Sequence, residues 1–322
     1  MSRRTLPPPP GGDGCAPLDA VFSAVVRRAG PLAVAAADAL RGGRRLRARL
    51  ALDCAAALGA DDGDALRWAA ACELLHAASL VHDDLQDGDE ARRGAPSAWV
   101  AHGGAVAIAL GDLFVAEAFA AASGVRSPGG RAELPALLAR GMAAAVRGQA
   151  EGFASLAPPR LTPRAWTAAA RGKAGALFAL PAEGAVVLAG GGTRARAAAR
   201  RAAERIGVAY QILDDRDDLA ADLAHGAPNA VAAAFLAGPA SAAEAAALRA
   251  LLAGQARETG GADPGAWAAR IGGSSAAEAC AAGALRLLAG ARSVAARDLP
   301  GPLAAELGRR ADALEHRLAR GS

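Results

Sequence analysis

The chain has 322 residues, 53% of them hydrophobic and 3% aromatic, which supplies enough apolar material for a core and excludes an intrinsically disordered protein. Its formal net charge of +4 comes almost entirely from scattered arginines, with few aromatic side chains among them to stack on bases, so we expect no nucleic-acid partner. Lys173 is the only lysine in the sequence.

The N-terminal segment is rich in proline and glycine and lacks the apolar run of a signal peptide. We therefore expect residues 1–16 to be a disordered lead-in and 17–322 to form one domain. The four cysteines show no C-x-x-C spacing, which favours reduced thiols and a cytoplasmic location. The apolar stretches 105–122 and 174–192 contain acidic residues, so we expect buried helices and no transmembrane segment.

Helical periodicity dominates the rest of the chain, and proline and glycine turns separate the periodic segments. Runs of alternating β-branched and polar residues are nearly absent, so strands are not expected. We expect helices over residues 17–29, 31–41, 45–59, 63–87, 97–124, 131–156, 162–172, 174–190, 194–221, 227–238, 241–255, 263–288 and 300–319. The sequence therefore predicts an all-α fold.

Two of these expected helices carry the same acidic pattern, Asp-Asp-x-x-Asp. The motifs consist of Asp83, Asp84 and Asp87 in the first helix, and of Asp214, Asp215 and Asp218 in the second. The first and last aspartates of each motif are four residues apart, so they lie on one helix face and repel each other. Clustered carboxylate oxygens are the ligands that a hard cation such as Mg²⁺ prefers.

The flanking residues favour a metal site over a solvated acidic helix end, which is the alternative for a single motif. Each motif follows a strongly apolar segment, 74–81 or 206–213, so each emerges at the end of a buried helix. Mg²⁺ between two such helices would hold a phosphate or diphosphate. Arg92 and Arg93 follow the first motif, and arginine forks donate charge-assisted hydrogen bonds to phosphate oxygens. We interpret this arrangement as a diphosphate site.

Several separated motifs in the same order resemble the trans-isoprenyl diphosphate synthases, the polyprenyl synthetase family, over about residues 35–235. The matching segments are GGRRLR (42–47), HAASLVHDDLQDGDEARRGAPSAW (76–99), GD (111–112), KAGALF (173–178) and YQILDDRDD (210–218). The resemblance implies a single-domain helical bundle of the isoprenoid synthase type with a central substrate cavity. It also implies a homodimer.

The resemblance assigns roles to particular side chains. The six aspartates of the two motifs are the candidate Mg²⁺ ligands, and the metal in turn holds an allylic prenyl diphosphate. Arg92 and Lys173 are expected to contact that diphosphate, and Gln211 to lie near the reacting allylic carbon. The second substrate, isopentenyl diphosphate, is expected to be held through its own diphosphate by Arg44, Arg47, His76 and Arg93.

These parts fit one reaction, in which diphosphate leaves an allylic carbon and the isopentenyl double bond attacks the resulting cation. We therefore expect a prenyltransferase that makes an all-trans polyprenyl diphosphate. Ala78, Ser79 and Leu75 precede the first motif by one to two turns and line the path of the growing chain, and the small residues among them favour a product of twenty carbons or more. The alternatives are a terpene cyclase-like enzyme and a non-catalytic subunit of a heteromeric synthase.

The sequence also departs from the family pattern. Arg44 stands in place of the lysine of the Gly-Gly-Lys element, and Ala174 in place of the threonine of the Lys-Thr element. The loop after Asp218 is short, and its expected lysine is replaced by the segment 225–227. Because that lysine would contact diphosphate, its loss favours the non-catalytic alternative, whereas the two complete aspartate motifs argue against it.

Overall fold

The computed structural model describes residues 16–155, 160–254 and 263–320. Residues 1–15 of the expected lead-in lie outside the described residues. The helices are α1 (Ala16–Arg28), α2 (Ala33–Ala39), α3 (Leu46–Ala57), α4 (Asp62–Asp87), α5 (Ala98–His102), α6 (Gly104–Ser123), α7 (Pro128–Ser155), α8 (Pro163–Ala170), α9 (Ala176–Leu188), α10 (Thr193–Asp217), α11 (Leu219–His225), α12 (Ala230–Ala237), α13 (Ala242–Leu252), α15 (Pro264–Gly272), α16 (Ser275–Asp298) and α17 (Gly301–Arg320). A 3₁₀ turn, η1 (Gly30–Leu32), precedes α2, and a π-helical turn, η3 (Arg171–Gly175), joins α8 to α9.

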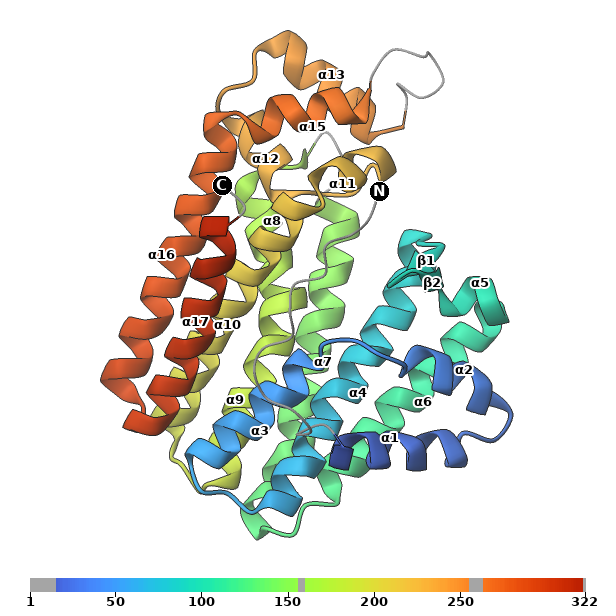
Figure 1. Ribbon diagram of the computed structural model, residues 1–322, viewed down its shortest axis with the longest axis vertical. Helices are drawn as coiled ribbons and strands as arrows, with labels where there is room; N and C mark the ends of the chain where they lie inside the picture. Colours follow the sequence, from blue (N-terminus) through green and yellow to red (C-terminus); the bar gives the residue numbers. More distant parts are fainter. Residues whose placement is uncertain (1–15, 156–159, 255–262, 321–322) are drawn as a thin grey trace.

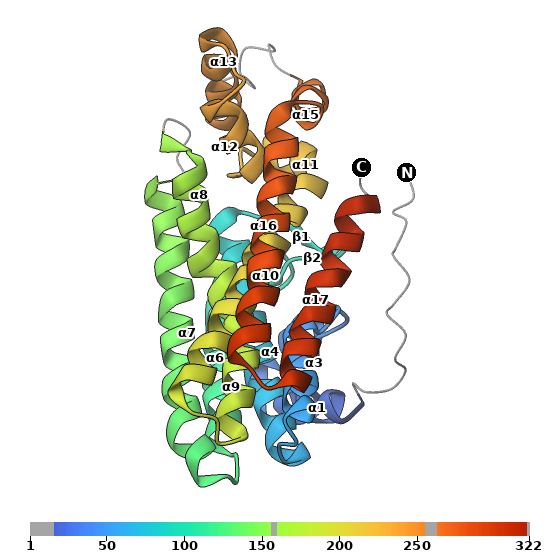
Figure 2. The same ribbon diagram turned by 90° about the vertical axis from the view of Figure 1, so that its left-hand side faces the viewer.

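The long helices lie side by side and form a bundle, as Figures 1 and 2 show. Helix α4 packs against α3, α6 and α9, and α10 packs against α9 and α16. Trp68 of α4 is fully buried against Gly184 of α9, where a methyl group would lie 2.1 Å from the indole ring. The Trp68 indole N–H also donates to the carbonyl of Pro181 at 3.3 Å. The all-α prediction is therefore confirmed, and a glycine permits this close contact between two central helices.

A short hairpin differs from the expectation of a chain without strands. Strand β1 (Ala91–Arg92) pairs antiparallel with β2 (Ala95–Pro96). The two residues between them, Arg93 and Gly94, have φ values of 56° and 81°, which is the left-handed conformation that two-residue hairpin turns require. Two-residue strands are too short to produce an alternating pattern, so no periodic signal marks them in the sequence.

Some helix boundaries also differ from the expected ones. Gly103, with φ of 90°, divides the helix expected over 97–124 into α5 and α6. The helix expected over 194–221 ends at Asp217, and α11 follows it directly. Helices α6 and α16 are long and apolar enough by composition to cross a membrane, and 33% and 28% of the residues in their most apolar stretches are buried in the structure. Both pack against other helices of the bundle, α6 against α4 and α16 against α10.

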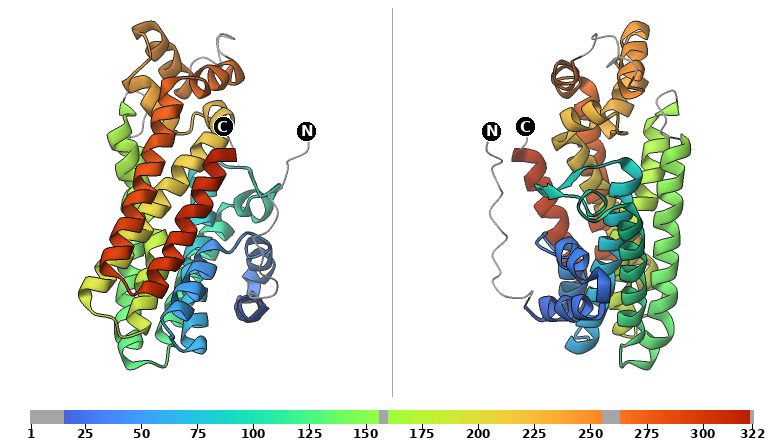
Figure 3. Two further views of the ribbon diagram at one scale, coloured as in Figure 1. Left: turned by 60° about the vertical axis from the view of Figure 1, so that its left-hand side comes forward. Right: turned by 90° about the vertical axis from the view of Figure 1, so that its right-hand side faces the viewer.

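Helices α4 and α10 end on the same side of the bundle, α4 next to the hairpin and α10 next to α11 (Figures 1 and 3). The end of α4 is set by Gly88, which caps the helix in the left-handed conformation with φ of 72°. Its beginning is set by Asp61, whose side chain accepts a hydrogen bond from the backbone of Asp64 at 2.9 Å. These caps place the first aspartate motif in the last turn of α4.

Candidate functional site

The first motif lies beside the only lysine of the chain. The Lys173 ammonium lies 3.1 Å from a carboxylate oxygen of Asp83 and 4.0 Å from one of Asp87. Gln149 of α7 donates a hydrogen bond to Asp87 at 3.4 Å. Asp83 and Asp87 therefore share one face of α4, as their spacing predicts, and a cation already lies between them.

Two glycines bring Lys173 to this position. A methyl group at Gly148 of α7 would lie 2.5 Å from the backbone nitrogen of Lys173, and one at Gly172 would lie 2.8 Å from Gly148. Only residues without side chains permit this approach of α7 and η3. The single π turn of η3 then carries the Lys173 side chain toward α4, and such turns are frequent at functional sites.

Asp84 faces away from Lys173. It is 2% exposed and forms an ion pair with Arg92, which also contacts Asp89 at 3.5 Å. Burial raises the pKa of Asp84, and the hydrogen bond from Arg92 opposes that shift. The pair fixes the hairpin to the end of α4, so in this structure Arg92 is occupied by a carboxylate.

The aspartates of the second motif also differ in their surroundings, one being buried and two lying near the surface. Asp214 accepts a hydrogen bond from Arg317 of α17 at 2.7 Å. Asp215 is 5% exposed and accepts hydrogen bonds from the Gln211 side chain at 2.8 Å and from the backbone N–H of Ala230 at 2.7 Å. Burial raises the pKa of Asp215 to about 7. Asp215 thus binds the first turn of α12, whereas Asp214 and the exposed Asp218 stay near the surface.

The short loop after the second motif is held by Asn229. Its side chain donates to the backbone carbonyl of Asp215 at 2.6 Å and to Asp222 at 2.7 Å, and accepts from the first N–H groups of α12. Burial raises the pKa of Asp222 to about 6. Asn229 is fully buried, so it gives the loop a fixed shape in the place where the family pattern has a lysine-bearing segment.

A basic cluster lies next to the aspartates. Arg47 is 9% exposed, with its guanidinium 4.8 Å from the centre of the Phe178 ring. Burial, followed by the charges of Arg47, Arg93 and Arg92, holds the pKa of His76 well below its usual value, so the imidazole is neutral. The Nε of Arg47 and the Nδ1 of His76 are buried without a hydrogen-bond partner among the described residues. A buried polar atom without a partner needs an explanation, and a bound anion or water beside Arg47 would supply one.

The loop before α3 completes this basic cluster. A methyl group at Gly43 would lie 2.7 Å from a guanidinium nitrogen of Arg93, so the glycine allows Arg93 to lie against the backbone. Arg44 is exposed; burial raises the pKa of Asp214, and the charges of Arg317 and, to a smaller extent, Arg44 oppose that shift. Of the four residues expected to bind isopentenyl diphosphate, Arg47 and Arg93 lie near enough to His76 to lower its pKa after burial has done so, and Arg44 acts on Asp214.

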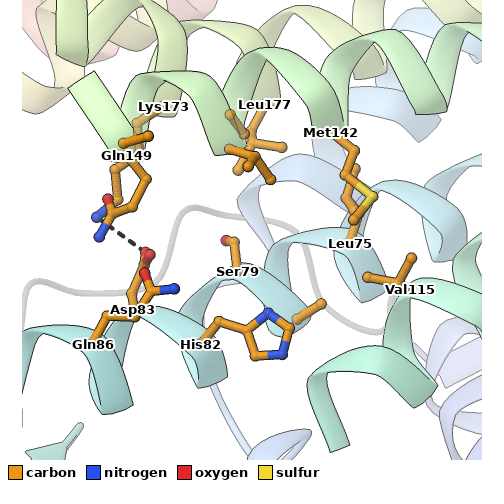
Figure 4. Close-up of a pocket in the computed structure, with 14 residues that line it drawn as sticks. Leu75, Ser79, His82, Asp83, Gln86, Val115, Met142, Gln149, Lys173 and Leu177 are labelled. Atoms are coloured by element: carbon orange, nitrogen blue, oxygen red, sulfur yellow. Dashed lines mark ion pairs between the residues drawn. The ribbon is translucent and has the colours of Figure 1, made fainter. Parts of the chain in front are cut away.

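A cavity of about 190 Å³ extends from the first motif between α4, α6, α7 and α9 (Figure 4). Its charged end carries Asp83, Gln86, Gln149 and Lys173, and its apolar end carries Leu75, Val115 and Met142. Ala78 and Ser79 line the space between the two ends, together with Leu177. The cavity therefore suits a ligand with an anionic head, which the charged end would bind, and an apolar tail, which the apolar end would surround.

The donor set fits Mg²⁺. Among the described residues no three acidic, histidine or cysteine side chains come close enough to form a complete metal cluster. Asp83 and Asp87 nevertheless share the ammonium of Lys173, so a positive charge is already held where their oxygens converge. Mg²⁺ commonly takes one or two carboxylates and completes its shell with water and phosphate oxygens, which suits this pair.

Two residues of the site were missed in the sequence. Arg317 is separated from Asp214 by 103 residues, and nothing near it in the sequence indicates its role. Glu73 is 4% exposed and accepts a hydrogen bond from the backbone of Ala48 at 3.1 Å, and its charge acts on Arg47 and Arg93. Glu73 lies one turn before His76 on α4, which is a local signal that could have identified it.

The chain is similar to known proteins in sequence and in fold. The sequence model of the family described as polyprenyl synthetase matches residues 31–228. A short chain isoprenyl diphosphate synthase of Methanothermobacter thermautotrophicus is 34% identical over 56% of this chain and 56% of its own length. A (2E,6E)-farnesyl diphosphate synthase of Mycobacterium tuberculosis is 36% identical over 54% of this chain and 48% of its own length. The matches thus span about half the length of these curated relatives.

Solved structures show the same fold over nearly the whole chain. The crystal structure of a polyprenyl synthetase from Streptomyces coelicolor has a TM-score of 0.84 and 26% identity, and covers 94% of this chain and 97% of that one. A decaprenyl diphosphate synthase from Rhodobacter capsulatus has a TM-score of 0.82 and 23% identity, covering 94% and 96%. The isoprenoid synthase fold expected from the sequence is confirmed. Because the family model matches more than half of the residues, this chain belongs to the polyprenyl synthetase family.

Proposed function

We propose that this chain is a magnesium-dependent trans-prenyltransferase that condenses isopentenyl diphosphate with an allylic prenyl diphosphate. The basic cluster carries the proposal, because Arg47 and His76 have buried polar atoms without partners among the described residues. A second anion site next to the aspartate motifs is needed for a condensation of two diphosphates. A terpene cyclase-like enzyme, which takes one diphosphate, has no use for it.

We assign the aspartates and Lys173 to the metal and the allylic diphosphate. Asp83, Asp87 and Asp214 are the proposed metal ligands, and Lys173 donates to the allylic diphosphate as it leaves. Bound Mg²⁺ supplies positive charge that stabilises the leaving diphosphate. Asp218 stays in the proposed ligand set because it is exposed beside Asp214, whereas Asp84 and Asp215 hold the hairpin and α12 in place.

We propose the following order of bond changes. The allylic carbon–oxygen bond breaks and its electron pair leaves with the diphosphate. The isopentenyl double bond then attacks the allylic cation, and a proton passes to the departed diphosphate. Gln211, fixed by its hydrogen bond to Asp215, is the proposed neighbour of the reacting carbon, and Arg92 is the second donor to the allylic diphosphate. No covalent intermediate with the protein is required.

The product and setting are also part of the proposal. Ala78 and Ser79 are small and line the cavity, which supports growth to geranylgeranyl diphosphate or a longer product. We propose a cytoplasmic enzyme that acts as a homodimer. The segment 225–227 without a lysine favours one competitor, a non-catalytic subunit of a heteromeric synthase, because it leaves the allylic diphosphate with one cation fewer.

One assay separates these functions. Purified protein is incubated with Mg²⁺, labelled isopentenyl diphosphate and a five-, ten- or fifteen-carbon allylic primer, and products are separated by chromatography after dephosphorylation. Label in an all-trans product longer than the primer is the expected result. No incorporation with any primer would contradict the proposal and support the non-catalytic subunit. A cyclic hydrocarbon formed from a primer alone would support the cyclase.

A further inference from the structure

Arg317, near the end of α17, lies against the second aspartate motif. One guanidinium nitrogen, Nη2, donates both to Asp214 and to Asp217, each at 2.7 Å, and Nε donates to Asp217 at 3.2 Å. Helix α17 packs along α10, as Figure 3 shows, so the last turns of the two helices lie side by side. Helix α17 therefore supplies a cation that pairs directly with Asp214.

This ion pair differs from the others on the surface of α17. The Arg317 side chain is 17% exposed, its guanidinium lies 5.4 Å from the centre of the Tyr210 ring, and its Nη1 is buried without a partner among the described residues. Burial lowers the pKa of Arg317, but the hydrogen bonds to Asp217 and Asp214 leave it raised overall. The Tyr210 ring and the two carboxylates therefore hold the guanidinium at Asp214 more firmly than a solvated arginine such as Arg320 could be held.

Asp217 is not a member of the Asp-Asp-x-x-Asp pattern, yet it makes two of the three contacts with Arg317. It therefore anchors the guanidinium independently of Asp214. If another cation takes the Asp214 oxygens, Arg317 keeps a carboxylate partner and its charge remains close by. Arg317 can therefore be displaced from Asp214 by another cation while it remains paired with Asp217.

We propose that Arg317 competes with the divalent metal for Asp214, so that the C-terminal helix controls how readily the second motif is loaded. The inference rests on the proposed function only in taking Asp214 as a metal ligand. At the first motif Lys173 is 40% exposed and flexible, so the metal displaces it at a smaller cost. The second motif accordingly loads after the first.

The test is a Mn²⁺ titration of the full chain without any diphosphate, with free Mn²⁺ counted by electron paramagnetic resonance. Arg317→Met removes the charge but keeps an apolar side chain against Tyr210. We expect it to bind the later Mn²⁺ about fivefold more tightly than the unchanged protein, which corresponds to a partly exposed ion pair. Arg320→Met is the matched control, because it removes the same charge from an exposed position on α17.

Two outcomes would overturn the inference. Arg317→Met could bind Mn²⁺ no more tightly than the unchanged protein. Alternatively, Arg320→Met could show the same increase in Mn²⁺ affinity, which would mean that the increase comes from the change in net charge and not from the contact with Asp214. A merely structural role for Arg317 would weaken metal binding in the variant rather than strengthen it. If Arg317→Met does not fold, Arg317→Lys replaces it, and about a twofold gain is expected because the fork geometry is lost while the charge remains.

A double variant separates this inference from the proposed function. In Asp214→Asn the Arg317→Met substitution should produce no gain, because the contested ligand is absent. A gain that persists there would overturn the inference. A chain that shows the predicted Mn²⁺ behaviour but no incorporation of isopentenyl diphosphate would instead contradict the prenyltransferase proposal and leave the competition at Asp214 intact.

Discussion

The Lys173 ammonium lies 3.1 Å from Asp83, at the charged end of the cavity (Figure 4). If this cation assists departure of the allylic diphosphate, Lys173→Gln should lower kcat by about 100-fold, the usual effect of removing one donor from a developing anion. Arg171→Gln is the control, because Arg171 lies in the same π turn but is 60% exposed and pairs with Glu204. Steady-state rates of isopentenyl incorporation check the prediction, and equal rates in the two variants would contradict it.

Asp83 and Asp214 should both be indispensable. Asp83→Ala and Asp214→Ala are expected to abolish turnover while far-UV circular dichroism stays unchanged, since neither side chain belongs to the buried core. Asp62→Ala, an exposed aspartate in the first turn of the same helix as Asp83, serves as the control. Normal rates in either motif variant would refute the metal assignment.

The contact between Gly43 and Arg93 gives a test of the second anion site. Gly43→Ala adds a methyl group that would lie 2.7 Å from the Arg93 guanidinium, whereas the methyl group of Gly42→Ala would meet nothing within 4 Å. Both glycines have positive φ, 84° and 68°, so backbone strain is similar in the two variants. We expect Gly43→Ala to raise the KM for isopentenyl diphosphate about tenfold relative to Gly42→Ala, with the KM for the allylic primer unchanged. Similar KM values for isopentenyl diphosphate in both variants would remove Arg93 from that site.

Sequence reasoning succeeded where local signals determine the outcome. The helix expected over 63–87 differs from α4 by one residue, because Asp61 and Gly88 are strong local caps. The same-face relation of Asp83 and Asp87 follows from helical spacing alone, and Lys173 contacts both.

Sequence reasoning failed where packing between distant segments determines which residues are in contact. Helical geometry turns adjacent residues to different faces, but only the fold shows that α12 covers Asp215 while α17 brings Arg317 to Asp214. The hairpin that directs Arg92 back to Asp84 consists of two-residue strands, which leave no periodic pattern in the sequence. Contacts over about a hundred residues depend on the packing of whole helices.

The buried carboxyl of Asp215 predicts a pH dependence of stability. Its pKa is about 7 in the folded protein, above the ordinary value of 3.8, so the folded state binds the proton more tightly than the unfolded state. The free energy of unfolding should therefore fall as pH rises from about 4 to about 7, by on the order of 4 kcal/mol from this group.

In Asp215→Asn the side chain cannot ionise, so the free energy of unfolding should fall less between pH 5 and pH 8 than in the unchanged protein. Urea unfolding at these two pH values, in the presence of a chelator, measures that free energy. Asp62→Asn is the control and should show the same pH dependence of stability as the unchanged protein. Asp222, whose pKa is raised to about 6, titrates in both variants, and its charge helps to raise the pKa of Asp215, so Asp222→Asn is measured alongside to account for its share. The same decline in Asp215→Asn as in the unchanged protein would show that Asp215 is ionised in the fold at pH 5.

The far end of the cavity should set the length of the product. Leu75 lies two turns before Asp83, about 12 Å along α4, and meets Met142 and Val115 from α7 and α6 (Figure 4). Met142 is unbranched and flexible, so Met142→Ala removes most of this end wall without disturbing the helix backbone. Chromatography of the dephosphorylated products should then show longer chains, and Ser79→Phe, which fills the cavity one turn nearer the first motif, should shorten them.

Val146→Ala is the matched control for Met142→Ala at the far end of the cavity. Val146 lines the same cavity one turn closer to the charged end, but its side chain is 58% exposed, so shortening it opens the side of the cavity and not its end. The longest product of Val146→Ala should equal that of the unchanged protein. Lengthening in Val146→Ala but not in Met142→Ala would mean that the chain leaves the cavity sideways between α6 and α7, past Val146, and that Leu75 and Met142 do not stop its growth.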